Sequence, residues 1–271
     1  MNKIEFVSTL SPDMRETILA KLNEMEAANG VKIVFAIESG SRAWGFPSPD
    51  SDYDARFVYA RPTDWYLSIS PGRDVIELPI EGDLDINGWD IKKALGLLLK
   101  PNPVLLERLS SPIRYVWNDE VCSKLKALGE RVGHGPSCLH HYLNLGENLW
   151  KRHLKDEEDV KIKRYFYVLR PAMALRWVRM RPDEIPPMNF QDLMAGVDLD
   201  ADLTEELRRL LIAKSETNEL GFAPRIPVLD RFVLDEYEKA KQVLPDFRAS
   251  REDLRSEADA LFRDIVKGGS I

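Results

Sequence analysis

The stretch of sequence that decides the fold is Glu38–Gly45 (ESGSRAWG), followed after a short loop by Ser51–Asp54 (SDYD). The residues before it, Val31–Ile37, are rich in β-branched side chains and apolar except for Lys32, which favours a buried strand. The loop is rich in Gly, Pro and Ser, and residues 52–59 return to a strand pattern. The sequence therefore predicts two strands joined by a polar loop, with chemically useful residues at both ends of the loop.

Asp52 and Asp54 form an Asp-x-Asp pair at the start of the second strand. Side chains alternate along a strand, so both carboxylates are expected on the same face. Two carboxylates that close repel each other unless a cation neutralises them, and a hard divalent ion such as Mg²⁺ or Mn²⁺ prefers oxygen ligands. Gly40 lets the backbone approach a phosphate closely, and Ser41 offers that phosphate a hydroxyl and an N–H group. The combination predicts a metal-assisted phosphate site.

A third carboxylate is expected on a neighbouring strand. Asp85 fits, because it stands between two apolar residues in Leu84–Trp89, which has a strand pattern. Asp90 is the alternative, but it also fits as the N-cap of a helix over Ile91–Leu99. We prefer Asp85, and the choice between the two is open at this point.

Composition excludes several classes of protein. The chain has 271 residues, of which 44% are hydrophobic and 31% charged, as is ordinary for a globular protein with a packed core. No apolar run approaches the roughly 20 residues of a membrane span, so no membrane association is expected. With only Cys122 and Cys138, a disulfide framework is not expected, and a cytoplasmic location is the default. The net charge of −7 argues against broad binding of long nucleic acid but leaves room for a local basic groove.

The pattern of elements changes near residue 118. Before this point strands alternate with short helices, and the first helix is predicted from a Ser11 cap to Gly30. We therefore predict an α+β protein, with a small mixed β-sheet and flanking helices over residues 1–118 and an all-helical domain over residues 119–271. The helices predicted in the second part are 119–131, 137–155, 158–180, 202–215, 229–243 and 249–267.

A basic stretch with interspersed aromatic residues lies within the predicted helical part. It comprises Lys151–Lys155, Lys161–Tyr167, Arg170, Arg176, Arg179 and Arg181. Such a stretch is suited to line a groove for a triphosphate or an RNA end. The alternative is an amphipathic helix whose charges face water.

Together, a Gly-Ser pair, ten further residues, Asp-x-Asp and then apolar-Asp-apolar resemble the DNA polymerase β-like nucleotidyltransferase superfamily. More narrowly, the sequence resembles the predicted nucleotidyltransferase branch associated with RNA repair (RlaP). The motifs that carry this narrower resemblance are Gly40–Gly45, Ser51–Phe57, Gly88–Lys93, Asn102-Pro103 and Leu106-Glu107. Several ordered motifs are a much stronger signal than Asp-x-Asp alone.

The resemblance implies that residues 1–118 form a nucleotidyltransferase core. Such a core transfers a nucleoside monophosphate from an NTP, here expected to be ATP, to an acceptor hydroxyl and releases pyrophosphate. The expected ligands of two Mg²⁺ or Mn²⁺ ions are Asp52, Asp54 and Asp85, with Asp90 as the alternative third carboxylate. The expected nucleotide- and phosphate-binding residues are Gly40, Ser41, Arg42, Arg56 and Lys93.

The identity of the acceptor is less determined than the reaction. The resemblance to the RNA-repair branch implies an RNA end, such as that of a tRNA. The net charge of −7 instead favours a small molecule of the aminoglycoside type or a protein side chain. A regulatory protein that binds nucleotide without turnover is the remaining possibility, and the intact Gly-Ser pair and strand carboxylates speak against it.

Overall fold

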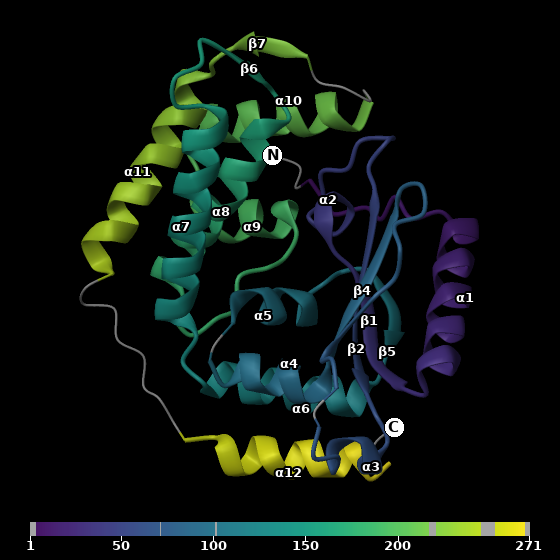
Figure 1. The fold of residues 1–271 in the computed structure, drawn as a ribbon. Coiled ribbons are helices and arrows are strands. Elements are labelled where there is room, and N and C mark those ends of the chain that lie inside the picture. The colour runs from purple at the N-terminus through teal and green to yellow at the C-terminus, as the bar shows by residue number, and fades with distance from the viewer. Residues whose placement is uncertain (1–3, 71, 101, 217–220, 245–252, 269–271) are drawn as a thin grey trace. The chain divides into compact units, whose positions relative to one another are not determined.

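The computed structural model describes residues 4–70, 72–100, 102–216, 221–244 and 253–268 (Figure 1). The chain forms two compact units that are interleaved along the sequence. The first, called here the sheet unit, comprises Ser8–Ala43, Asp52–Gly133 and Ser250–Ile271. The second, called here the helical unit, comprises Met1–Val7, Trp44–Ser51 and His134–Ala249. No helix in the described ranges has both the length and the apolar character needed to cross a membrane.

The sheet unit is built on a five-stranded mixed sheet with the strand order β3-β4-β2-β1-β5. Its strands are β1 (Lys32–Glu38), β2 (Tyr53–Ala60), β3 (Val75–Glu77), β4 (Leu84–Asp90) and β5 (Arg114–Trp117). β2 pairs with β4 in parallel, and the other neighbours pair antiparallel. The predicted α+β class with a mixed sheet is therefore confirmed. Strand β5 was not predicted, because a short strand at the sheet edge carries little pattern of its own.

Helices flank both faces of this sheet (Figure 1). They are α1 (Pro12–Asn29), α2 (Gly40–Ala43), α3 (Thr63–Tyr66), α4 (Ile91–Leu98), α5 (Pro103–Leu109), α6 (Asp119–Arg131) and α12 (Arg255–Val266). Helix α1 begins as predicted, because the Ser11 hydroxyl accepts a hydrogen bond from the Met14 N–H group at 3.2 Å. It ends at Gly30, whose φ of 59° places it in the left-handed region.

One hydrophobic core of the sheet unit lies between the sheet and α1. Ile18 and Leu22 of α1 pack with Phe57 and Tyr59 of β2 and with Ile86 of β4. Burying each of these side chains stabilises the fold by about 1.5–3 kcal/mol. Since side chains alternate along a strand, the intervening residues of β2 and β4 point to the opposite face, and that face carries the candidate site.

The helical unit contains α7 (Gly135–His153), α8 (Arg164–Met180), α9 (Phe190–Gly196), α10 (Ala201–Glu216) and α11 (Pro227–Val243). It also contains a two-stranded antiparallel sheet of β6 (Asp159–Lys161) and β7 (Phe222–Pro224). The prediction of an all-helical second part is therefore wrong in this detail. Residues 159–161, near the start of the predicted helix 158–180, instead pair with residues 222–224. Residues 249–252 of the last predicted helix lie outside the described residues.

The division between the units differs from a single boundary near residue 118. Helices α6 and α12 contact each other and α4, so both belong to the sheet unit. The loop residues Trp44–Ser51 belong to the helical unit. Within that unit Phe46 is 3% exposed, and its ring centroid lies 4.9 Å from that of Phe166 and 6.0 Å from that of Phe190. Apolar contacts distant in sequence thus hold the loop that connects the Gly-Ser pair to the Asp-x-Asp pair.

Candidate active site

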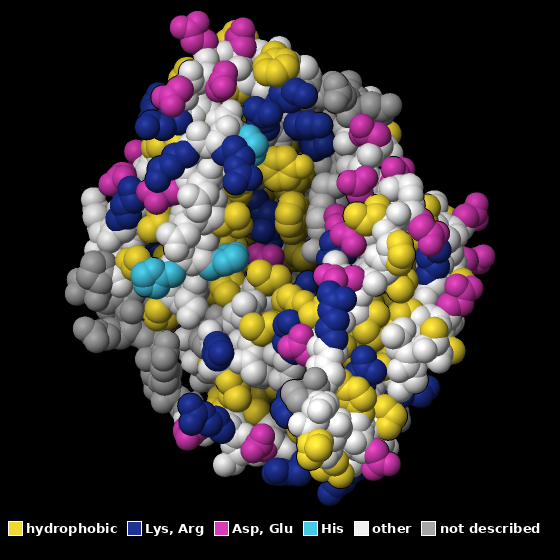
Figure 2. All heavy atoms as spheres, viewed as in Figure 1, with side chains coloured by type: hydrophobic (Ala, Val, Ile, Leu, Met, Phe, Trp, Pro, Cys, Tyr) yellow, Lys and Arg dark blue, Asp and Glu magenta, His cyan; other side chains and the backbone are white. Residues whose placement is uncertain are grey.

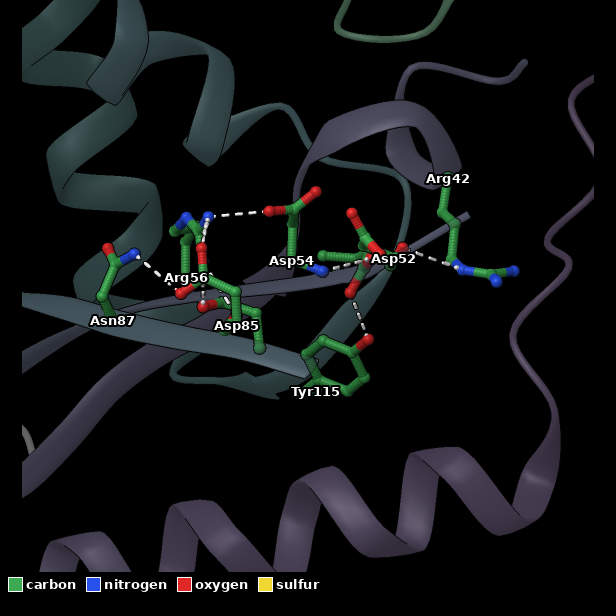
Figure 3. Close-up of polar contacts among 9 residues, drawn as sticks. Arg42, Asp52, Asp54, Arg56, Asp85, Asn87 and Tyr115 are labelled. Carbon is green, nitrogen blue, oxygen red and sulfur yellow. Dashed lines mark hydrogen bonds and ion pairs between the residues drawn. The ribbon is translucent and has the colours of Figure 1, made fainter. Parts of the chain in front are cut away.

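The parallel pairing of β2 and β4 brings two of the predicted carboxylates together. Asp54 stands beside Asp85 in register, on the face opposite α1 (Figure 3). Arg56 Nη2 lies 2.7 Å from Asp54 Oδ1 and 2.7 Å from Asp85 Oδ2, so one guanidinium bridges both carboxylates. Asp52, two residues before Asp54, is exposed, and its carbonyl oxygen accepts a hydrogen bond from Arg42 Nε at 3.2 Å.

The charges of these residues influence one another. Burial raises the pKa of Asp54, Arg56 opposes this effect, and the negative charges of Asp85 and Asp52 reinforce it. A cation is therefore favourable beside Asp54, and Arg56 supplies one.

The donor set fits a divalent ion in its chemistry, because carboxylate oxygens are the ligands that Mg²⁺ and Mn²⁺ prefer. Among the described residues, however, no three His, Cys, Asp or Glu side chains are grouped closely enough to hold an ion. Arg56 occupies one oxygen each of Asp54 and Asp85. An ion that binds both carboxylates would compete with this guanidinium for their oxygens.

The Gly-Ser turn packs directly against Asp54. The Ser39 N–H group donates to the Asp54 carbonyl oxygen at 2.8 Å, which holds the turn to β2. Gly40 has a φ of 59°, and a Cβ atom at this position would lie 2.0 Å from Asp54 Oδ2. Glycine is therefore required here for both its conformation and its size. Ser41 follows in the first turn of α2 and is half-buried.

Two predicted phosphate-binding cations are engaged elsewhere. Arg42 is buried, donates from Nη1 to Thr9 Oγ1 at 3.0 Å and stacks over the Tyr53 ring at 3.9 Å. These contacts fix the start of the loop after β1 to the segment before α1 and to the first residue of β2. Lys93 forms an ion pair with Asp74 at 3.0 Å and lines a separate pocket.

Asp90 lies away from the Asp54–Asp85 pair. It is five residues beyond Asp85, about 16 Å along β4, and its side chain points to the other face. One carboxylate oxygen accepts from the Lys92 N–H group and the other from the Tyr66 hydroxyl, both at 2.8 Å. Asp90 therefore caps α4, and Asp85 is the carboxylate that shares a face with Asp54.

Glu38 is a buried carboxyl behind the site that was not predicted. Its Oε1 accepts a hydrogen bond from the Asp54 N–H group at 2.9 Å, and its Oε2 accepts one from the Tyr115 hydroxyl at 2.5 Å (Figure 3). Burial raises the pKa of Glu38 to about 7, although both hydrogen bonds act in the opposite direction. The available signal was a charged residue directly after the apolar run Ile33–Ile37. Glu38 holds the backbone of Asp54 in place.

The arginines of the basic stretch make contacts inside the helical unit. Arg176 and Arg179 bind the fully buried carboxylate of Glu236. Arg170 and Arg181 donate to backbone carbonyl groups of the same unit. These four arginines therefore follow neither prediction for the basic stretch, because they do not line an open groove and do not form a solvated helix face. Other Lys and Arg side chains are visible on the surface of the helical unit, interspersed with Asp and Glu (Figure 2).

A Gly-Ser turn against an Asp-x-Asp strand, with a further carboxylate on the parallel neighbour, is the arrangement expected of a polymerase β-like nucleotidyltransferase. Residues 14–264 match the family described as "RlaP: RNA repair pathway DNA polymerase beta family", and the chain belongs to this family. Membership of this family points to a polymerase β-like nucleotidyltransferase.

Two further proteins are similar to this chain. It is 42% identical over 254 residues to the uncharacterized protein YcgL of Bacillus subtilis (strain 168), an alignment that covers 94% of this chain and 97% of that protein. A solved nucleotidyltransferase-like protein from Exiguobacterium sibiricum 255-15 shares 10% identity over 94% of this chain and 80% of that chain. Its TM-score is 0.29.

Proposed function

We propose that this protein is a Mg²⁺-dependent nucleotidyltransferase that uses an NTP, with ATP as the first candidate, to modify a hydroxyl group at an RNA end in the cytoplasm. A nucleoside monophosphate is transferred, and pyrophosphate is released. The observation that carries the proposal is the pairing of Asp54 with Asp85 on one sheet face, with Gly40 packed against Asp54. Membership of a family described as part of an RNA repair pathway supports RNA as the acceptor.

The carboxylates of Asp52, Asp54 and Asp85 would hold two divalent ions after the side chains move closer together and Arg56 is displaced. When bound, such ions neutralise the triphosphate and make the acceptor hydroxyl more acidic. Because Gly40 carries no Cβ atom, the turn packs against Asp54 Oδ2, and the N–H groups of the turn would donate to phosphate oxygens bound beside that carboxylate. Ser41 would contribute its hydroxyl to the same phosphates.

Arg56 has a positioning role in this proposal. Its guanidinium keeps Asp54 and Asp85 at one place before substrate arrives, so that their mutual repulsion does not separate them. When the carboxylates turn to other ligands, the freed guanidinium provides positive charge for the phosphoryl group in transfer.

A small molecule or a protein side chain is the second candidate acceptor. One observation favours it: the arginines at 170, 176, 179 and 181 are engaged inside the helical unit and do not provide a basic surface for RNA. Salt dependence separates the candidates, because binding of an RNA backbone weakens steeply with salt and binding of a neutral acceptor does not.

The experiment that tests the proposal compares ATP labelled at the α-phosphate with ATP labelled at the γ-phosphate. The protein is incubated with Mg²⁺ and, in separate reactions, tRNA, broken RNA ends, aminoglycosides or cell lysate. We expect the α-label to appear on an acceptor and the γ-label in pyrophosphate, with neither product formed by Asp54→Asn. ATP binding without transfer of either label would instead favour a regulatory nucleotide-binding protein.

A further inference from the structure

Arg108 is a buried cation on the face of the sheet that carries the candidate site. It lies on α5, is 6% exposed, and its guanidinium carbon lies 3.6 Å from the centroid of the Trp89 ring. Asp85, Asn87 and Trp89 alternate along β4, so their side chains point to one face. Trp89 is about 13 Å from Asp85 along the strand. Arg108 is therefore placed over the same face as Asp54 and Asp85.

The charge of Arg108 is poorly compensated. Its Nη1 atom is buried and has no hydrogen-bond partner within the part of the chain that the structure describes. Burial lowers the pKa of Arg108 to about 9, and the positive charge of Arg56 acts in the same direction. Arg56 differs in this respect, because Asp54 and Asp85 both neutralise it.

A guanidinium removed from water without an anion is strongly unfavourable. Stacking on Trp89 offsets only part of this cost. A bound anion would offset more of it, and the planar guanidinium presents paired N–H donors that match the oxygens of a phosphate group. Arg56 is already paired with Asp54 and Asp85, so Arg108 would contribute more than Arg56 to holding such an anion.

We propose that Arg108 is a phosphate-binding residue of this site, whose guanidinium holds a phosphate group of a substrate on the sheet face beside Asp54 and Asp85. The other predicted cations do not fill this role, because Arg42 fixes the loop and Lys93 pairs with Asp74. The inference rests on the proposed function for the identity of the substrate. The phosphate belongs either to the nucleotide or to the end of the acceptor, and the chemistry of recognition is the same.

The first test is calorimetric binding of inorganic pyrophosphate to the full chain in EDTA. Chelation leaves the anion to bind to the cations of the chain alone. Arg108→Met keeps a side chain that can pack on Trp89, and we expect it to weaken pyrophosphate binding about 10- to 100-fold. Arg108→Lys keeps the charge without the paired donors, so its loss is expected to be smaller.

Arg114→Met is the matched control. Arg114 also stacks on a tryptophan, Trp117, at 4.0 Å, but it is exposed and lies on the edge strand β5. This variant should bind pyrophosphate as the wild type does. The proposal is overturned if the wild type does not bind pyrophosphate, or if a folded Arg108→Met or Arg108→Lys protein binds it as tightly as the wild type. Circular dichroism verifies folding, and the lysine variant decides the matter if the methionine variant is unfolded.

Steady-state kinetics distinguish the two sources of the phosphate. If Arg108 holds the nucleotide, the lysine variant raises KM for ATP with every acceptor. If it holds the acceptor, KM rises for a phosphorylated RNA end and not for the dephosphorylated one. A protein that binds pyrophosphate through Arg108 but transfers no nucleotide would contradict the proposed function and leave this inference standing.

Discussion

Replacing Glu38 with Gln isolates the effect of the buried carboxyl behind Asp54. Glu38 is fully buried, and its oxygens accept hydrogen bonds from the Asp54 N–H group and the Tyr115 hydroxyl. Glutamine keeps an acceptor oxygen for the N–H group, and its amide can donate to the Tyr115 oxygen. The substitution therefore removes the titrating group and retains both contacts.

The size of the effect follows from the proton affinity of Glu38. Burial raises its pKa from 4.5 to about 7. Between these pH values the folded state holds a proton that the unfolded chain has released, so the free energy of unfolding falls as the pH rises. A tenfold change in proton affinity is worth about 1.4 kcal/mol. The full loss is therefore about 3 kcal/mol, of which about 2.5 kcal/mol falls between pH 5 and pH 8.

Urea unfolding in EDTA at pH 5 and pH 8 measures this effect. We expect the stability of Glu38→Gln relative to the wild type to increase by about 2.5 kcal/mol between the two pH values. Groups that titrate identically in both proteins cancel in this comparison. The exposed Glu16→Gln variant controls for the loss of one carboxylate from the chain. A difference between Glu38→Gln and wild type that is independent of pH would refute the assignment of a raised pKa to Glu38.

Three other substitutions test separate parts of the structure. Gly40→Ala places a Cβ atom 2.0 Å from Asp54 Oδ2 in a left-handed backbone. We expect the free energy of unfolding to fall by about 1–2 kcal/mol and pyrophosphate release to slow about 100-fold. Wild-type stability and rate in this variant would show that the turn is not constrained. Arg56→Met leaves Asp54 and Asp85 without their shared cation. The free energy of unfolding of the metal-free protein should fall by about 1–3 kcal/mol, and Mg²⁺ should raise Tm more in the variant than in the wild type. Equal effects of Mg²⁺ on Tm in both proteins would count against competition between the guanidinium and the ion. Phe46→Ala removes a ring buried in the helical unit and should lower the free energy of unfolding in urea by about 3–5 kcal/mol. A decrease well below this would show that the loop is not anchored by Phe46.

The position of Asp85 on a strand was accessible to prediction, because a carboxylate between two apolar residues is a local pattern. The same is true of the cap at Asp90, which follows from a polar residue directly before a helical pattern. These local rules were enough to prefer Asp85 as the partner of Asp54. Parallel register, which sets the two side by side, required the structure.

The partners of the cations were not accessible in this way, because they depend on which elements pack together. Arg56 was expected to bind phosphate, but its position between Asp54 and Asp85 makes it their counter-ion. Lys93 follows the far end of β4 and is carried away from the site. Arg108 has no local motif, and its placement over Trp89 arises from the packing of α5 on the sheet.

The interleaving of the two units is also a tertiary effect. The loop between the Gly-Ser turn and the Asp-x-Asp strand has no local pattern that assigns it to the helices. Its anchor, Phe46, finds its partners in Phe166 and Phe190, which lie far along the chain. No rule based on sequence spacing connects such residues.

The most direct measurement compares pyrophosphate release by the wild type with that by Asp54→Asn, Asp85→Asn and Asp90→Asn, under one set of conditions with ATP, Mg²⁺ and RNA ends. We expect Asp54→Asn and Asp85→Asn to lose about 100-fold or more of the rate while remaining folded. Asp90→Asn should retain the rate per folded molecule, because Asp90 caps a helix at the other end of β4. Release that survives in Asp85→Asn but is lost in folded Asp90→Asn, or release that needs no divalent ion, would contradict the assignment of the site.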